Sequence, residues 1–196
     1  MRILALDLSM SSAGYACWAP GDAKVQSGAW TLGTEYTSVG GVFQKLHEKM
    51  SDLATFERFD AVYYEEPLHL KTHVKNSHAR AHMLAVGLAA HAESWCYCND
   101  IRPRPTDMAH WRAHFLKGMQ RPKNYDGSKV EDALKIMANE RCRALGFKPR
   151  CHDESEAIGI LSFALDEKQI EPPWRAQFWV EGVRKEDLIM PGRRRT

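Results

Sequence analysis

An aspartate lies inside the first apolar segment of the chain. Residues 2–18 read RILALDLSMSSAGYACW, which predicts a buried strand over 2–8 with Asp7 near its carboxyl end. Burying a carboxylate is unfavourable unless it is paired or binds a metal ion. Asp7 is therefore either a cap for the polar turn at 9–12 or a ligand that needs a rigid support.

Two glutamates end another apolar segment. Glu65 and Glu66 follow Ala-Val-Tyr-Tyr at 61–64, and Pro67 stops the strand predicted over 60–65. Successive side chains of a strand point to opposite faces, so only one of the two glutamates can share a pocket with Asp7.

A third acidic group precedes the apolar run at 157–161. Asp153 and Glu156 have the spacing of a capping box, in which Asp153 is the N-cap of a helix and Glu156 its third residue. The same i, i+3 spacing places both carboxylates on one face of the helix. There they could approach other acids that lie beyond the start of the helix.

Together, Asp7, Glu65, Asp153 and Glu156 form a candidate metal site. Clustered carboxylates repel one another, and hard divalent cations such as Mg²⁺ or Mn²⁺ remove that conflict. Two such ions about 3.5–4 Å apart activate a water and stabilise the leaving oxygen of a phosphodiester. Zinc bound by Cys96, Cys98, Cys151 and His152 is a weaker alternative, because the usual Cys-x-x-Cys spacing is missing.

The elements that must position these acids follow from the apolar patterns. Strands are expected over 2–8, 13–18, about 24–32, 60–65 and 101–104, the last ending in a proline-rich turn at 103–105. Helices are expected over 39–59, 76–97, 106–116, 129–145 and 154–166. The order predicts an α/β fold with a mixed five-stranded sheet, in which a three-strand antiparallel meander precedes strands parallel to the first, flanked by helices.

Composition bounds the class of protein. The chain has 196 residues, 44% of them hydrophobic and 27% charged, which is typical of one soluble globular domain. No apolar stretch approaches the roughly 20 residues of a membrane span, and the start does not look like a signal peptide. Five cysteines at irregular spacings argue against a disulfide framework. We therefore expect a cytoplasmic protein without a membrane partner.

The acidic motifs resemble those of the RuvC family of Holliday junction resolvases, in particular its phage-type branch. Residues 3–9 with Gly-Tyr-Ala at 14–16 are similar to the first motif, and residues 59–65 to the second. Asp153-x-x-Glu156-Ala157 is similar to the last motif, although better-known members have aspartate at the position of Glu156. The ordered matches span about residues 2–166.

The resemblance implies an RNase H-like fold, a homodimer, and Mg²⁺-dependent (or Mn²⁺-dependent) nicking of four-way DNA junctions, with a host cytoplasm as the location if the source is viral. Its metal and catalytic ligands would be Asp7, Glu65, Asp153 and Glu156, with register favouring Glu65 over Glu66. Residues 1–166 would form the nuclease domain, and 167–196 an extension of open role. His152 is either a phosphate contact or a solvated neighbour.

Basic residues near these motifs are candidate contacts for the phosphates of branched DNA. They are Lys71, Lys75, Arg80, Arg112, Lys117, Arg121 and Lys123. The pairs His69/His73 and His78/His82 have helical spacing for a metal but lack a third ligand.

Three other functions stay open. A nuclease of the same fold could act on other branched DNA or on RNA–DNA hybrids. A non-catalytic nucleic-acid-binding module would be better off without the repulsion of four acids. An actin-like ATPase shares the first motif loosely, but it needs two such halves, and only one is visible in this sequence.

Overall fold

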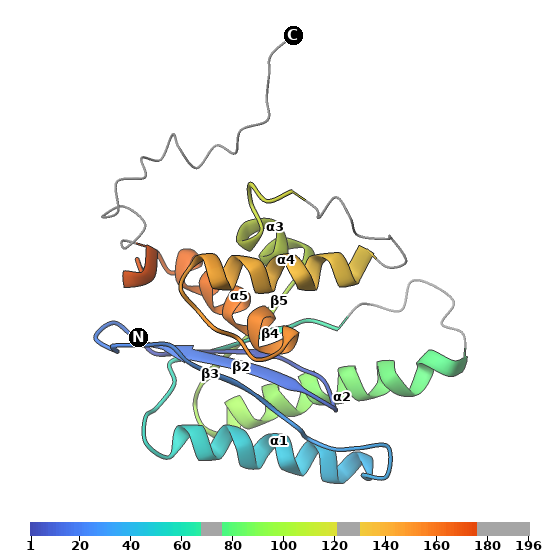
Figure 1. Ribbon diagram of the computed structural model, residues 1–196. Coiled ribbons are helices and arrows are strands. Elements are labelled where there is room, and N and C mark those ends of the chain that lie inside the picture. Colours follow the sequence, from blue (N-terminus) through green and yellow to red (C-terminus); the bar gives the residue numbers. More distant parts are fainter. Residues whose placement is uncertain (68–75, 121–129, 176–196) are drawn as a thin grey trace.

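The computed structural model describes residues 1–67, 76–120 and 130–175, with side chains described from 81 in the second helix and from 133 in the fourth. Figure 1 shows a central sheet with helices on both faces. The strands are β1 (Ile3–Asp7), β2 (Ala13–Trp18), β3 (Gln26–Trp30), β4 (Ala61–Glu65) and β5 (Arg102–Thr106). The helices are α1 (Val39–Ala54), α2 (Asn76–Cys98), α3 (Met108–Phe115), α4 (Val130–Ala144) and α5 (His152–Glu167).

The sheet has the predicted mixed topology. Its strand order is β3-β2-β1-β4-β5, with β1–β2 and β2–β3 antiparallel and β1–β4 and β4–β5 parallel. The expected antiparallel meander followed by strands parallel to the first is confirmed. β1 is central, which explains why its residues Ile3 to Leu6 are all fully buried.

Two hydrophobic cores cover the two faces of the sheet. Helices α1 and α2 cover one face, and α3, α4 and α5 cover the other (Figure 1). Strand alternation decides which side chains enter each core. Ile3 and Ala5 of β1 point to the α5 side, whereas Leu4 and Leu6 point to the α1 side. Asp7 follows Ile3 and Ala5 in this alternation and therefore faces α5.

Two predicted boundaries are wrong for physical reasons. α1 ends at Ala54 rather than at residue 59, because the chain turns at Thr55, and Phe59 reaches the core from the following loop. β5 continues through Pro103 and Pro105, which had predicted a turn. It lies at the edge of the sheet and pairs only with β4, so the missing proline N–H groups cost it little.

The described start of the C-terminal segment packs on the domain. Trp174 is 9% exposed and makes edge-to-face contacts with Trp18 and Phe147, with ring centroids 5.1 and 5.4 Å apart. The division at residue 166 stays a prediction, since residues 176–196 lie outside the described part. Within the described residues, no helix is both long and apolar enough to cross a membrane.

Candidate metal centre

The carboxylates of Asp7, Asp153 and Glu156 converge at one end of the central strand. One oxygen from each can be chosen so that all three lie within 4.8 Å of one another. Asp7 ends β1, and the other two belong to the first two turns of α5. Two segments that are distant in sequence thus supply three carboxylates, an all-oxygen donor set that suits a hard divalent cation such as Mg²⁺.

Glu65 lies next to this group because of the register of the parallel strands. Leu6 of β1 pairs with Tyr64 of β4, so the next step of the register sets Asp7 beside Glu65. Glu65 also shares the alternation of Ala61 and Tyr63, which face α5. The structure therefore brings all four predicted acids to one end of the sheet, with Glu65 outside the closest group of three.

A close approach at Gly14 sets the position of α5. Gly14 of β2 pairs with Asp7, and a Cβ built on Gly14 would lie only 2.0 Å from the carbonyl oxygen of Asp153. Only a residue without a side chain lets the first turn of α5 come this close to the ends of β1 and β2.

The capping-box interpretation of Asp153 and Glu156 is wrong. Cys151 is the N-cap of α5 and makes no side-chain cap hydrogen bond, so Asp153 stands inside the first helical turn. The buried Glu154 ties this turn to its surroundings: it accepts hydrogen bonds of 2.8 Å from the Ser27 hydroxyl and from the Arg150 amide. The turn after β1 is likewise closed by the Ser9 hydroxyl, which accepts from the Ser12 amide at 3.2 Å, without Asp7.

Electrostatics at Asp7 show the strain that an acidic cluster creates. Burial raises the pKa of Asp7 well above its usual range, and the charges of Glu156, Glu65 and Asp153 raise it further. Lys135 of α4 acts in the opposite direction and lowers this pKa. Such a group favours the bound proton or, equally, a bound cation.

Two residues of α3 complete the walls of the site. Trp111 Nε1 donates to Glu65 Oε2 at 3.0 Å, and Arg112 Nη2 donates to Glu156 Oε1 in a buried ion pair. Arg112 was predicted to contact DNA phosphate from the surface, but its side chain is only 10% exposed and lies at the acids themselves. Trp111 could not be found from sequence, because nothing in a helical pattern indicates which carboxylate an indole will reach.

A basic groove adjoins the acidic cluster. It encloses about 620 Å³ between α4 and the start of α5. Its lining includes Lys135, Arg143, Arg150, His152 and Asp153, together with Glu140. The exposed His152 therefore faces this groove. Lys135, Arg143 and Arg150 were missed as candidate contacts, although the excess of basic residues over 112–150 was the signal that could have indicated them.

Among the other candidate contacts, Lys117 is the one whose side chain belongs to the described part of the chain. Lys117 is exposed in the loop after α3. The described residues do not include Lys71, Lys75, Arg121 and Lys123, nor the side chain of Arg80. The same is true of His69 and His73 and of the side chain of His78. The zinc alternative is not supported, because Cys96 is buried in the core beside α1 whereas Cys151 begins α5 on the opposite face.

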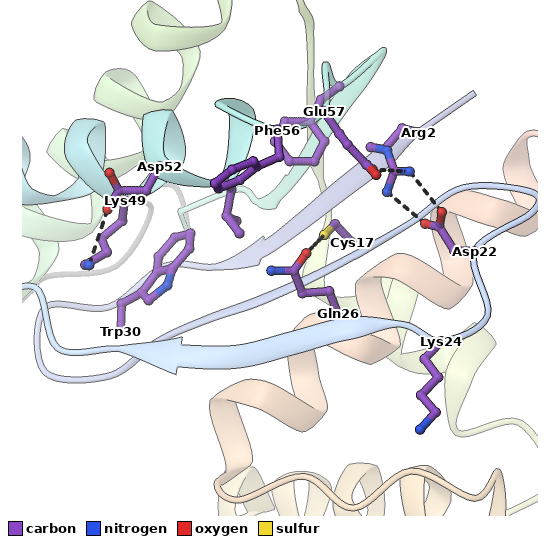
Figure 2. A pocket seen from close by; sticks show the side chains of 12 residues that line it. Arg2, Cys17, Asp22, Lys24, Gln26, Trp30, Lys49, Asp52, Phe56 and Glu57 are labelled. Atoms are coloured by element: carbon purple, nitrogen blue, oxygen red, sulfur yellow. Dashed lines mark hydrogen bonds and ion pairs between the residues drawn. The ribbon is translucent and has the colours of Figure 1, made fainter.

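A second hollow, of about 350 Å³, lies on the α1 side of the sheet (Figure 2). Arg2 dominates its charged lining, binding Asp22 at 2.8 Å and pairing with Glu57. Cys17 donates to Gln26 at 3.6 Å across the same hollow. Because these polar groups bind one another, the hollow is less suited to chemistry than the acidic cluster.

Comparison with known proteins identifies the fold. No protein-family model matches the chain, and no curated protein sequence does. The structure is similar to that of Thermus thermophilus RuvC in complex with a Holliday junction substrate, with a TM-score of 0.56 and 14% identity over 82% of this chain and 89% of that one. A second Thermus thermophilus RuvC structure matches with a TM-score of 0.52 and 15% identity over 82% and 90%. The yeast mitochondrial Holliday junction resolvase matches with a TM-score of 0.49 and 11% identity over 91% and 82%. The two RuvC matches establish that this chain has the RNase H-like fold.

Proposed function

We propose that this protein is a metal-dependent endonuclease that nicks four-way DNA junctions. The observation that carries the proposal is the convergence of Asp7, Asp153 and Glu156 within 4.8 Å at the end of the central strand, with Glu65 beside them. The likeness of the fold to RuvC, whose structure was solved with a Holliday junction substrate, supports the choice of substrate.

The four acids would hold the metal, and the chain supplies the geometry. Bound Mg²⁺ or Mn²⁺, as one ion or two, would lower the pKa of a water and stabilise the leaving oxygen of the scissile phosphodiester. Asp7 and Glu65 are fixed by the ends of two paired strands, and Asp153 and Glu156 by the first turns of a buried helix. This rigid framework positions the site before substrate arrives.

The basic groove gives the DNA backbone an approach to the acids. Lys135, Arg143 and Arg150 are cations beside Asp153, and a four-way junction is recognised mainly through its phosphates and its shape. Lys117 is a further exposed cation after α3. We retain Lys71, Lys75, Arg80, Arg121 and Lys123 as proposed contacts from the sequence.

We also propose that the protein acts as a homodimer, because a junction carries two equivalent strands to be nicked. The outer face of α2 supports this. Met83, Val86 and Tyr97 are 72%, 45% and 68% exposed and follow one side of the helix, with the exposed Ala90 between them. Such an apolar stripe is suited to packing on a second copy.

The decisive test is a nicking assay on a labelled synthetic four-way junction. Duplex, fork and RNA–DNA hybrid substrates run in parallel, each with Mg²⁺, with Mn²⁺ and with EDTA. We expect metal-dependent cuts near the branch point by the wild type and by Asp52→Asn, a control at an exposed acid of α1. Asp7→Asn should lose cleavage by at least about 100-fold and still bind the junction.

Other outcomes separate the alternatives. Equal cutting of forks and hybrids would retain the metal site and assign a broader substrate. Binding of junctions without any cutting, unchanged or tighter in Asp7→Asn, would identify a non-catalytic nucleic-acid-binding module.

A further inference from the structure

Two consecutive residues of α3 each bind one of the two glutamates of the candidate site. Trp111 donates from Nε1 to Oε2 of Glu65 at 3.0 Å, and Arg112 donates from Nη2 to Oε1 of Glu156. The two glutamates come from β4 and α5. One short helix thus engages one oxygen of each longer carboxylate.

These donors are held rigidly. Asp107 caps the start of α3 by accepting from the His110 amide at 3.0 Å. Trp111 is fully buried against α5, where a Cβ at Gly159 would meet its ring at 2.7 Å. The guanidinium of Arg112 lies over the Trp111 ring, 5.2 Å from its centroid. The two donors therefore cannot move aside without repacking the contact between α3 and α5.

An N–H donor that binds one oxygen of a carboxylate takes one of its lone pairs and fixes the orientation of the group, which disfavours an arrangement in which both oxygens face the same cation. Mg²⁺ takes six ligands in near-ideal octahedral geometry and accepts single carboxylate oxygens together with waters. Ca²⁺ takes six to eight oxygens and is commonly held by carboxylates that donate both. Engaging one oxygen of Glu65 and of Glu156 therefore disfavours Ca²⁺ more than Mg²⁺.

We propose that Trp111 and Arg112 are positioning residues that restrict Glu65 and Glu156 to single-oxygen ligation and thereby make the site select Mg²⁺ over Ca²⁺. This inference rests on the proposed metal-binding function of the site. The two residues act through the glutamates and touch neither the substrate nor the cation.

The ratio of two affinities isolates this effect from charge. Removing Arg112 adds one net negative charge beside the acids and strengthens the attraction for any divalent cation. Mg²⁺ and Ca²⁺ carry the same charge, so this contribution largely cancels in the ratio of their dissociation constants. A change in the ratio reports ligand geometry.

The test is isothermal titration calorimetry of the full chain with MgCl₂ and, separately, with CaCl₂. The variants are Trp111→Phe, which retains an aromatic ring but removes the indole N–H, and Arg112→Met. The matched controls are Trp95→Phe, which removes a 2.9 Å indole bond to Ser51 between α1 and α2, and Arg175→Gln, which removes an ion pair with Asp166 at the far end of α5. Thermal melting checks that each variant is folded.

In Trp111→Phe and in Arg112→Met, we expect the affinity for Ca²⁺ relative to that for Mg²⁺ to rise by about tenfold. Neither control should change this ratio of affinities. If the ratio of the two affinities in Trp111→Phe equals that of the wild type, even where both affinities fall, the inference is overturned while the metal site stands. If the wild type binds neither cation, or if Asp7→Asn binds both cations as tightly as the wild type does, the proposed metal site and this inference fail together.

Discussion

At the scale of single residues, the candidate site brings carboxylates of like charge close together. Asp7 ends a central strand and meets three other carboxylates, and its pKa is raised by burial first and by those charges second. One of the neighbours, Glu156, has the buried Arg112 as its counterion. Without a cation, the cluster is therefore least stable when Asp7 is ionised.

Replacing Asp7 should consequently stabilise the metal-free protein. The folded-state pKa of Asp7 lies above its unfolded value, so the folded protein binds the proton more readily. The free energy of unfolding must then fall as pH rises through the interval between the two pKa values. In EDTA at neutral pH we therefore expect a higher Tm for Asp7→Asn than for the wild type, by about 2–4 °C for each kcal/mol gained.

Thermal melts of the wild type and Asp7→Asn in EDTA, taken at several pH values, measure this difference in Tm and its dependence on pH. The wild-type Tm should rise as the pH is lowered from neutral toward the ordinary pKa of an aspartate, 3.8, and the slope should be shallower in the variant. Asp52→Asn is the control, because its side chain is 70% exposed. A lower Tm for Asp7→Asn at neutral pH would show that Asp7 is stabilising even without metal.

At the scale of elements, the decisive contact is the approach of α5 to the ends of β1 and β2. α5 is buried along almost its whole length, and its first turn reaches Asp7 because Gly14 has no side chain. The same helix carries two of the four acids. Any change that moves its first turn outward therefore separates Asp153 and Glu156 from Asp7 while leaving the sheet intact.

Gly14→Ala tests that contact. The added methyl group would overlap the Asp153 carbonyl, and a fixed backbone atom cannot yield as a flexible side chain can. We expect a loss of about 1–3 kcal/mol in the free energy of unfolding, as for other overpacked sites. Affinity for Mn²⁺, measured by calorimetry, should fall together with cleavage.

Gly40→Ala is the matched control, since a Cβ there meets nothing within 4 Å and the residue lies in the exposed start of α1. It should leave metal binding unchanged and stability unchanged or slightly higher. Equal effects of the two alanine substitutions would contradict a specific role for the approach at Gly14.

At the scale of the whole molecule, the two faces of the sheet expose different groups. The α3–α5 face carries the acids and the basic groove, whereas the α1–α2 face leaves the apolar stripe of α2 exposed. A second copy packed on α2 would leave the α3–α5 face of each copy open to DNA, so that one dimer would present two cutting sites.

Light scattering after size-exclusion chromatography measures the oligomer. We expect twice the chain mass of 22.3 kDa for the wild type and the mass of one chain for a Met83→Glu/Val86→Glu double variant. Phe56→Glu, at an 89% exposed apolar residue in the turn after α1 and outside the stripe of α2, should remain a dimer. A monomeric wild type at micromolar concentration, or a dimer that tolerates both glutamates, would refute the proposed interface.

The sequence by itself predicted the fold, which the structure confirms, and named the four acids as candidates. Buried strands, amphipathic helices and their order leave few topologies, and the mixed sheet with a central first strand is one of them. Local chemistry also limited the candidates, because carboxylates at the ends of apolar segments are conspicuous. The predicted start of α5 was wrong, because the capping pattern at Asp153 competes with a start at Cys151. Contacts of the first turn with Gly14 and Ser27 favour the start at Cys151.

Only the tertiary structure decided which side chains from other elements complete the site. Strand register had already favoured Glu65 from the sequence, whereas the packing of α3 on α5 placed Trp111 and Arg112 on the two glutamates. Arg112 shows the physical reason most clearly. A basic residue on a helix is equally compatible with solvent, phosphate or a buried carboxylate, and its choice depends on long-range packing that no local pattern encodes.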